Sequence, residues 1–224
     1  YAASFGIDNI PREFKDNYIK YLKRFSSISV REEVGANIVE SLIEKRPKVV
    51  IDPSLLLDKK EWGKLINKPV TKGKYILIYQ RAYSETLIKF AERLSKITGY
   101  KIVTINGNPR QPIKAKYVLN AGPIEWLSLI MNAEFVVTNS FHGVAFSINF
   151  EKKFYVELLD SKFGVNSRLE NIIEKFGLEE RQIKEGNDIN IDDEINYINI
   201  NNKLSLEREK SIKYLKDALD FRGK

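Results

Sequence analysis

The sequence contains no cysteine and only one histidine among its 224 residues. The absence of cysteine excludes a disulfide framework, thiolate metal sites and a cysteine nucleophile, and it fits a reducing compartment. A single histidine cannot build a histidine-rich metal site, so we expect no metal. The chain also lacks the nucleotide-binding patterns G-x-G-x-x-G and G-x-x-x-x-G-K-[ST] and the serine-hydrolase elbow G-x-S-x-G.

Long apolar runs are missing too. No stretch approaches the roughly 20 apolar residues that a membrane-spanning helix needs. The chain opens on "YAASFGIDN", without a methionine or a basic-then-apolar leader. We therefore expect it to be a segment of a longer protein, and the missing signal peptide excludes no compartment.

Charge is plentiful and mostly basic, with a net charge of +7 and a pI near 9.3. Residues 179–194 hold seven acids against two basic residues, a net charge of −5, so the remaining residues carry +12. This balance favours anionic partners such as a phosphorylated metabolite or a membrane surface. No basic cluster with interleaved aromatics is present, so we expect no nucleic-acid binding.

Apolar strands without alternation are separated by amphipathic helices, which is typical of parallel β-α-β units in a sheet covered on both faces. The predicted strands are residues 25–30, 47–52, 75–80, 101–106, 117–122, 135–139 and 153–158, the second of them a short strand that ends at Asp52-Pro53. The predicted helices are residues 12–24, 31–46, 84–100, 123–133 and 167–177, and a last helix from about residue 204 with Ile212, Leu215 and Leu219 on one stripe. The hydrophilic stretch 58–74 predicts a boundary between two units.

The stretch "FVVTNSFHG" places the only histidine where a strand passes into a helix. Ligands of open α/β sheets bind at the carboxyl ends of the strands, where helix N-termini present backbone N–H groups to anions. Asn139, Ser140 and His142 are therefore candidate site residues, and Gly143 would let the backbone approach a ligand closely. An anion bound there would favour the protonated imidazole, so that His142 becomes an acid when substrate arrives. The alternative is that His142 only caps its helix.

Three arginines stand at comparable places. Arg31 and Arg81 directly follow predicted strands, and Arg168 lies at a helix start. A guanidinium at such a position is suited to holding a carboxylate or a phosphate. Each of the three is also explained by a surface or helix-capping role, so the arginines are candidate substrate-binding residues only.

The segment "NAGPIEWLSLIMNAEFVVTNSFHGVAFSINFEKKFYV" closely resembles the signature region of the polysaccharide pyruvyl transferase family. "YAASFGID", "ISVREEVG", "VVIDPSLLLDKKEW" and "NSRLENIIEKFGLEERQI" resemble further landmarks of that family in their usual order. The resemblance implies Rossmann-like parallel sheets in a two-lobed, GT-B-like α/β fold. Residues 1–60 would be the remainder of an incomplete N-terminal lobe, residues 61–200 the C-terminal domain, and residues 201–224 a closing helix.

The resemblance also implies a reaction of bacterial cell-envelope polysaccharide synthesis. The pyruvyl group of phosphoenolpyruvate is transferred to two hydroxyls of a sugar as a ketal, and phosphate is released. By position, His142 and Arg31 would be the functional residues. A positioned acid and fixed cationic groups suffice for this chemistry, so no cofactor is expected. The implied partners are phosphoenolpyruvate and a sugar or lipid-linked oligosaccharide, in the cytoplasm and, for a lipid-linked acceptor, at the inner membrane face.

The chain departs from the family pattern at three places, one of which is Val144, where a threonine is common. Some members carry an arginine where this chain has Ser140, and an aspartate is common in place of Asn139; Arg81 or Arg168 would then have to supply the missing cation. Two rival functions stay open. One is a GT-B-type glycosyltransferase that holds a nucleotide-sugar diphosphate at the same helix start, and the other is a non-catalytic domain of this fold.

Overall fold

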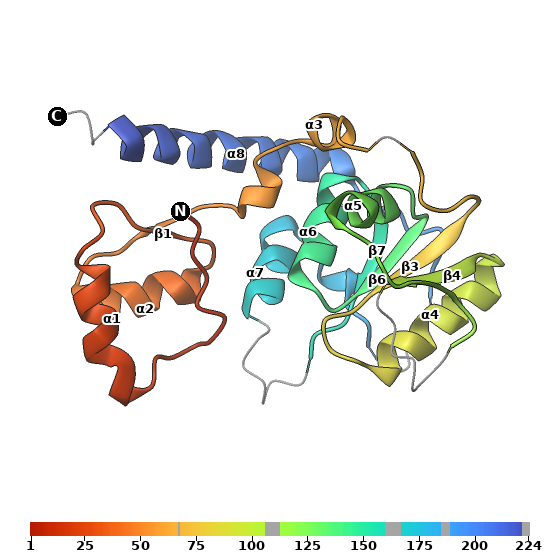
Figure 1. Cartoon of the computed structure of the whole chain (residues 1–224), viewed down its shortest axis with the longest axis horizontal. Coiled ribbons are helices and arrows are strands. Elements are labelled where there is room, and N and C mark those ends of the chain that lie inside the picture. The colour runs from red at the N-terminus through yellow and green to blue at the C-terminus, as the bar shows by residue number, and fades with distance from the viewer. Residues whose placement is uncertain (67, 106–112, 160–166, 185–188, 221–224) are drawn as a thin grey trace. The chain divides into compact units, whose positions relative to one another are not determined.

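The computed structural model describes residues 1–66, 68–105, 113–159, 167–184 and 189–220 (Figure 1). The chain forms two compact units, neither of which is continuous in sequence. Unit 1 contains residues 1–56, 159–176 and 198–224, and unit 2 contains residues 57–158 and 177–197.

Unit 2 is built on a parallel sheet with the strand order β5-β4-β3-β6-β7. The strands are β3 (Tyr75–Tyr79), β4 (Lys101–Ile105), β5 (Lys116–Val118), β6 (Phe135–Thr138) and β7 (Lys153–Val156). All neighbouring pairs run parallel. The central strands β3 and β6 are almost wholly buried, which explains why their sequences are continuously apolar. The predicted α/β class with parallel sheets is confirmed.

Helices cover both faces of this sheet. Helix α4 (Glu85–Thr98) packs Leu87, Phe90 and Leu94 into a buried cluster with side chains from β3, β4, β6 and β7. Helices α5 (Pro123–Met131) and α6 (Phe141–Asn149) pack against each other on the opposite face (Figure 1). Right-handed crossovers produce this arrangement, because β3 to β4 and β6 to β7 progress in opposite directions across the sheet. A short helix, α3 (Lys59–Gly63), precedes β3.

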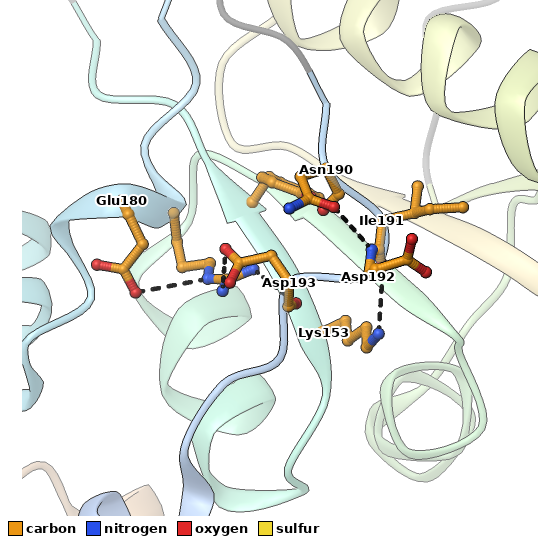
Figure 2. Close-up of polar contacts among 8 residues, drawn as sticks. Lys153, Glu180, Asn190, Ile191, Asp192 and Asp193 are labelled. Carbon is orange, nitrogen blue, oxygen red and sulfur yellow. Dashed lines mark hydrogen bonds and ion pairs between the residues drawn. The ribbon is translucent and has the colours of Figure 1, made fainter.

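The acidic segment lies along the edge strand β7, and we call residues 189–195 the strap. A 3-10 helix at Glu179–Arg181 leads to a backbone hydrogen bond from Ile183 N–H to Val156 O, which extends the edge. The strap then crosses β7: Lys153 Nζ donates to Ile191 O at 3.0 Å and Tyr155 donates to Asn190 O at 3.2 Å (Figure 2). Glu185 and Asp188 of the acidic segment lie outside the described residues.

The side chain of Arg181 holds the strap in place. It is 3% exposed and its Nη2 lies 2.7 Å from Asp193 Oδ2, while Glu180 lies at 3.7 Å from Nε. The guanidinium also stands over the ring of Tyr155 at 6.0 Å. Part of the acidity of this segment is therefore compensated by one buried cation.

Unit 1 contains a two-stranded parallel sheet of β1 (Ser29–Val30) and β2 (Lys48–Val49). Its helices are α1 (Lys15–Leu22), α2 (Glu33–Ile43), α7 (Ser167–Phe176) and α8 (Tyr197–Asp220), the last of which starts one residue before the unit boundary. Val30, Ala36 and Val39 form a small core to which α1 adds Leu22. Helices α7 and α8 are joined by an ion pair of Lys175 with Glu207 at 2.9 Å.

Several predicted boundaries differ from the observed ones. The first unit boundary, at Leu56 to Leu57, falls close to the expected position, but residues 159–176 and the last helix group with the N-terminal segment. The last helix begins at Tyr197 rather than near residue 204. Its buried residues are Ile200, Leu204 and Ser211, whereas Ile212 and Leu219 of the predicted stripe are exposed. The predicted stripe lies within this helix but does not mark its buried face, because apolar residues on an exposed helix face follow the same spacing as buried ones.

Candidate functional site

The candidate site lies where the strand order of unit 2 reverses. From β3 the chain moves to β4 and β5 on one side, and then returns to place β6 on the other side of β3. The carboxyl ends of β3 and β6 therefore flank the topological switch point, the usual ligand position in such sheets. Tyr79 pairs with Thr138 at these ends. Arg81 follows the first strand, and Asn139 to Gly143 follow the second.

A tight turn joins β6 to α6. Thr138 Oγ1 donates to Tyr79 O and accepts from the N–H of Ser140 at 3.1 Å, so one hydroxyl fixes both strand ends and the turn. Gly143 lies directly against Thr138: a Cβ at this position would overlap Oγ1 and meet Cγ2 at 2.9 Å. A glycine is needed here because the helix lies so close to its own strand; the expected close approach of this backbone to a ligand stays a prediction.

His142 is the second residue of α6 and its side chain is exposed. Its ring meets the ring of Phe141 edge-on, with centroids 5.4 Å apart. Ser140 is the N-cap residue, but its side chain makes no capping hydrogen bond, and the first helical bond runs from Val144 N–H to Ser140 O. An exposed imidazole thus stands at the N-terminus of a helix, a position that suits an anionic ligand.

Asn139 connects the two strand ends. Its Oδ1 accepts from the backbone N–H of Arg81 at 2.8 Å, and its Nδ2 donates to Ala82 O at 2.8 Å. The same Nδ2 lies 3.5 Å from Glu157 Oε2. Asn139 is 3% exposed, so its amide is occupied by protein groups. A direct contact of this side chain with substrate stays a prediction; the structure gives it the role of a connector.

Glu157 and Ser84 complete this edge and were not found from the sequence. Glu157 follows β7, and its Oε1 accepts from Ser84 Oγ at 2.6 Å. Ser84 is the N-cap of α4, and its Oγ accepts from Leu87 N–H at 3.2 Å. The available signal was the position of a carboxylate directly after the buried strand "KFYV", which is the same rule that singled out Arg31 and Arg81.

The other two candidate arginines belong to unit 1. Arg31 follows β1, where its Nε donates to Ala2 O at 3.0 Å and its Nη1 lies 2.6 Å from the buried carboxylate of Asp52. Arg168 is in the first turn of α7 and contributes, with Arg31, to the electrostatic environment of Glu32. The structure thus brings Arg81 to the His142 turn in unit 2, and it groups Arg31 with Arg168 in unit 1.

Glu32 is the N-cap residue of α2 and is 2% exposed. Burial raises the pKa of its carboxyl, although Ser4, Arg31 and Arg168 act in the opposite direction. Its Oε2 and the Nε of Arg168 are both buried without a hydrogen-bond partner.

Two kinds of feature are absent from the described ranges. None of the described residues form a group of three or more histidine, cysteine or acidic side chains arranged to hold a metal ion. No helix within the described ranges is long and apolar enough to cross a membrane.

Comparisons with known proteins place the chain in a family. A comparison with curated proteins gives no match. Among solved structures, UDP-N-acetylglucosamine 2-epimerase from Rickettsia bellii is similar, with 14% identity and a TM-score of 0.43 over 90% of this chain; the chain spans 62% of the length of that protein. The family model for polysaccharide pyruvyl transferase matches residues 1–160, which include β1 to β7 and the turn with His142. The chain therefore belongs to the polysaccharide pyruvyl transferase family.

Proposed function

We propose that this protein transfers the pyruvyl group of phosphoenolpyruvate to two hydroxyls of a sugar, as a ketal, during the synthesis of a surface polysaccharide. The observation that carries the proposal is the placement of His142. Within a chain of this family, the imidazole stands exposed at a helix N-terminus on the switch point of a parallel sheet. That position offers an acid and an anion site side by side.

The chemistry needs one proton donor and fixed positive groups. In the proposed sequence, His142 gives a proton to the methylene carbon of phosphoenolpyruvate, which forms the methyl group and leaves a cation at the carbon that bears the phosphate. A sugar hydroxyl adds to that carbon, and the proton it loses returns to the imidazole. Departure of phosphate regenerates the cation, and the second hydroxyl closes the ketal as its proton leaves with the phosphate.

The donor is highly anionic, and the groups around His142 are suited to it. The N–H groups at the N-terminus of α6 would receive the phosphate or the carboxylate, with Ser140 and Gly143 forming the start of that turn. Arg81 stands on the neighbouring loop and would supply a positive side chain. The acceptor is proposed to be a sugar or a lipid-linked oligosaccharide, the latter at the inner membrane face.

Ligand protection of the complete protein tests the donor. Phosphoenolpyruvate should raise the melting temperature in a concentration-dependent way, and nucleotide sugars should not, because only a ligand that binds the folded state stabilises it. Protection by a nucleotide sugar alone would favour the glycosyltransferase function instead. Mass spectrometry of the surface glycan should show a pyruvate ketal that is lost on deletion of the gene.

The acid role of His142 is tested by His142→Gln and His142→Ala. Both should lower kcat by about 100-fold to 10,000-fold, which is the usual contribution of a general acid. The Kd for phosphoenolpyruvate should change little in His142→Gln, because that side chain leaves the helix N–H groups in place. A loss in kcat below about tenfold would exclude the proposed proton transfer.

A further inference from the structure

Glu157 is a carboxylate on which three segments of unit 2 converge. Its backbone N–H donates to Thr138 O at 2.9 Å, which ties the residue to the end of β6. Its Oε1 accepts from Ser84, the cap of α4, and its Oε2 lies within reach of Asn139 Nδ2. Among the described contacts, both carboxylate oxygens are thus directed at protein donors of the candidate site.

The loop that carries Arg81 is held at both ends by this arrangement. At its start, Asn139 accepts from the N–H of Arg81 and donates to Ala82 O. At its end, the hydroxyl of Ser84 donates to Glu157 Oε1. The backbone N–H of Ser84 also donates to Gln80 Oε1 at 3.2 Å. The loop conformation therefore depends on Glu157 through Ser84 and Asn139.

The side chain of Arg81 is exposed, in contrast to its anchored backbone. Within the described residues no ion pair involves Arg81. Its positive charge is therefore not neutralised by Glu157 or by another acid in that part of the chain. Ser140, the N-cap residue of α6, brings no charge of its own. The backbone N–H of Arg81 donates to Asn139, the residue directly before Ser140, so the Arg81 backbone is fixed beside the helix N-terminus.

We propose that Glu157 is a positioning residue, which sets the Arg81 loop through Asn139 and Ser84 so that the Arg81 guanidinium binds the phosphate group of the donor beside the N-terminus of α6. The inference deepens the proposed function and rests on it for the identity of the donor. The phosphate-binding part depends only on the geometry of this edge.

A double-mutant cycle separates positioning from a general structural role. Calorimetry would give the Kd of the complete protein for phosphoenolpyruvate and for inorganic phosphate in wild type, Arg81→Ala, Glu157→Gln and the double variant. Glu157→Gln keeps an oxygen for Ser84 but places an amide where Asn139 needs an acceptor. Matched controls are Arg93→Ala on the exposed face of α4 and Glu134→Gln, an exposed residue just before the amino end of β6.

Arg81→Ala should weaken binding of both anions by about 10-fold to 100-fold, the range for a lost charge-assisted contact. Glu157→Gln should weaken it by about 3-fold to 10-fold, and the double variant should bind no worse than Arg81→Ala alone, because Glu157 acts through the arginine. The two controls should bind as wild type does. Circular dichroism and the melting temperature would verify that each variant folds.

Three outcomes distinguish this inference from the proposed function. Binding of phosphate but not of phosphoenolpyruvate, with the cycle non-additive, supports the inference and contradicts the proposed donor. Binding of phosphoenolpyruvate with additive losses, or with no loss in Arg81→Ala, supports the donor and overturns the inference. Absence of binding of either anion in wild type overturns both.

Discussion

At position 143 an added methyl group would collide with Thr138, and this makes Gly143→Ala a direct test of the turn that carries His142. Alanine is favoured over glycine inside a helix by about 1 kcal/mol, but overpacking typically costs about 1–3 kcal/mol. Because the side chain of Thr138 is anchored to Tyr79 O and cannot move aside, we expect the steric cost to exceed the helical gain. Urea unfolding should show a net loss of stability, and catalytic activity should fall with it.

Gly63→Ala is the matched control for this variant. Its nearest heavy atom is the flexible Met131 Cε at 3.4 Å, so stability should change little. Thr138→Ala in the Gly143→Ala background should recover part of the loss, despite removing a hydroxyl that supports the turn. If Gly143→Ala proved as stable as wild type, the close approach of α6 to β6 would be refuted.

Glu32→Gln is expected to stabilise the fold at neutral pH. The pKa of Glu32 is raised by its burial, so the folded state binds the proton more tightly than the unfolded chain does. Between the unfolded value and the raised folded value, stability from this group falls as the pH rises, and above both values the ionised carboxylate destabilises the fold. A neutral amide removes this penalty, for a gain of about 1 kcal/mol.

The measurement is the free energy of unfolding as a function of pH. In Glu32→Gln the decline of stability above the unfolded pKa should flatten, whereas Glu33→Gln, an exposed neighbour paired with Arg46, should keep the wild-type profile. A destabilising effect of Glu32→Gln at neutral pH would show that the ionised carboxylate is needed where it stands.

At the scale of elements, the strap depends on the buried cation of Arg181. Arg181→Ala should cost about 2–4 kcal/mol, because it leaves a cavity and releases Asp193. Arg181→Met should cost less, since it refills the volume. Asp193→Asn should cost about 1–3 kcal/mol, because the buried guanidinium would then lose its 2.7 Å partner.

Hydrogen exchange checks whether these losses are local. Amide protection should fall first in the strap and at the edge of β7, because local opening of an edge element needs less free energy than global unfolding. Asp192→Asn is the control: the neighbouring acid has no ion pair within the described residues, and its replacement should leave protection unchanged (Figure 2). Equal effects of Asp192→Asn and Asp193→Asn would contradict the anchoring role of Arg181.

The elements that the sequence predicted well are those whose burial is continuous over several residues. The runs "YILIYQ" and "FVVTN" became β3 and β6, and Ser84 and Gly99 bound α4 at the predicted ends. The same reasoning did not predict the limits of the short elements. Strand β1 has only two residues where six were predicted, and β2 likewise covers only part of the short strand predicted to end at Asp52-Pro53. Their limits are set by pairing partners distant in sequence, which local propensity does not register.

The candidate site, too, was predictable from the sequence only in part. The rule that ligands meet the carboxyl ends of strands pointed to Arg81, Asn139 and His142, and the structure places these three residues at one edge of the unit 2 sheet. Their roles stay predictions. It did not reveal that the amide of Asn139 is occupied by the Arg81 loop, nor that Glu157 completes the set, because these contacts join residues 18 to 73 positions apart. The same holds for Arg181, whose neighbours in sequence suggest an exposed charged segment while its side chain is buried.

At the scale of the whole molecule, the division into units is interleaved. Unit 2 takes its sheet from residues 57–158 and its strap from residues 177–197. A chain ending at residue 158 would therefore lack Arg181 and the segment that covers β7. For this reason, the experiments proposed above use the complete protein rather than one unit.

The net charge of +7 predicts that ionic strength governs donor binding. The acidic segment concentrates a charge of −5 in residues 179–194, so the rest of the chain presents +12 to a multiply charged anion. The Debye length falls from about 14 Å near 50 mM salt to roughly 4 Å near 500 mM, which screens the distant lysines and leaves the direct contacts. We expect the Kd for phosphoenolpyruvate to rise by about 3-fold to 10-fold over this range.

Calorimetric titrations in potassium chloride measure this dependence, and sucrose at equal osmolality is the control, because it adds no ions. Arg81→Ala should show a shallower slope of log Kd against log salt than wild type, since one charge near the ligand is gone. The slope should not reach zero, because the remaining basic side chains still attract the anion over a Debye length. A Kd independent of salt in the wild type would mean that the donor is bound through neutral groups alone, and the electrostatic basis of the site would have to be abandoned.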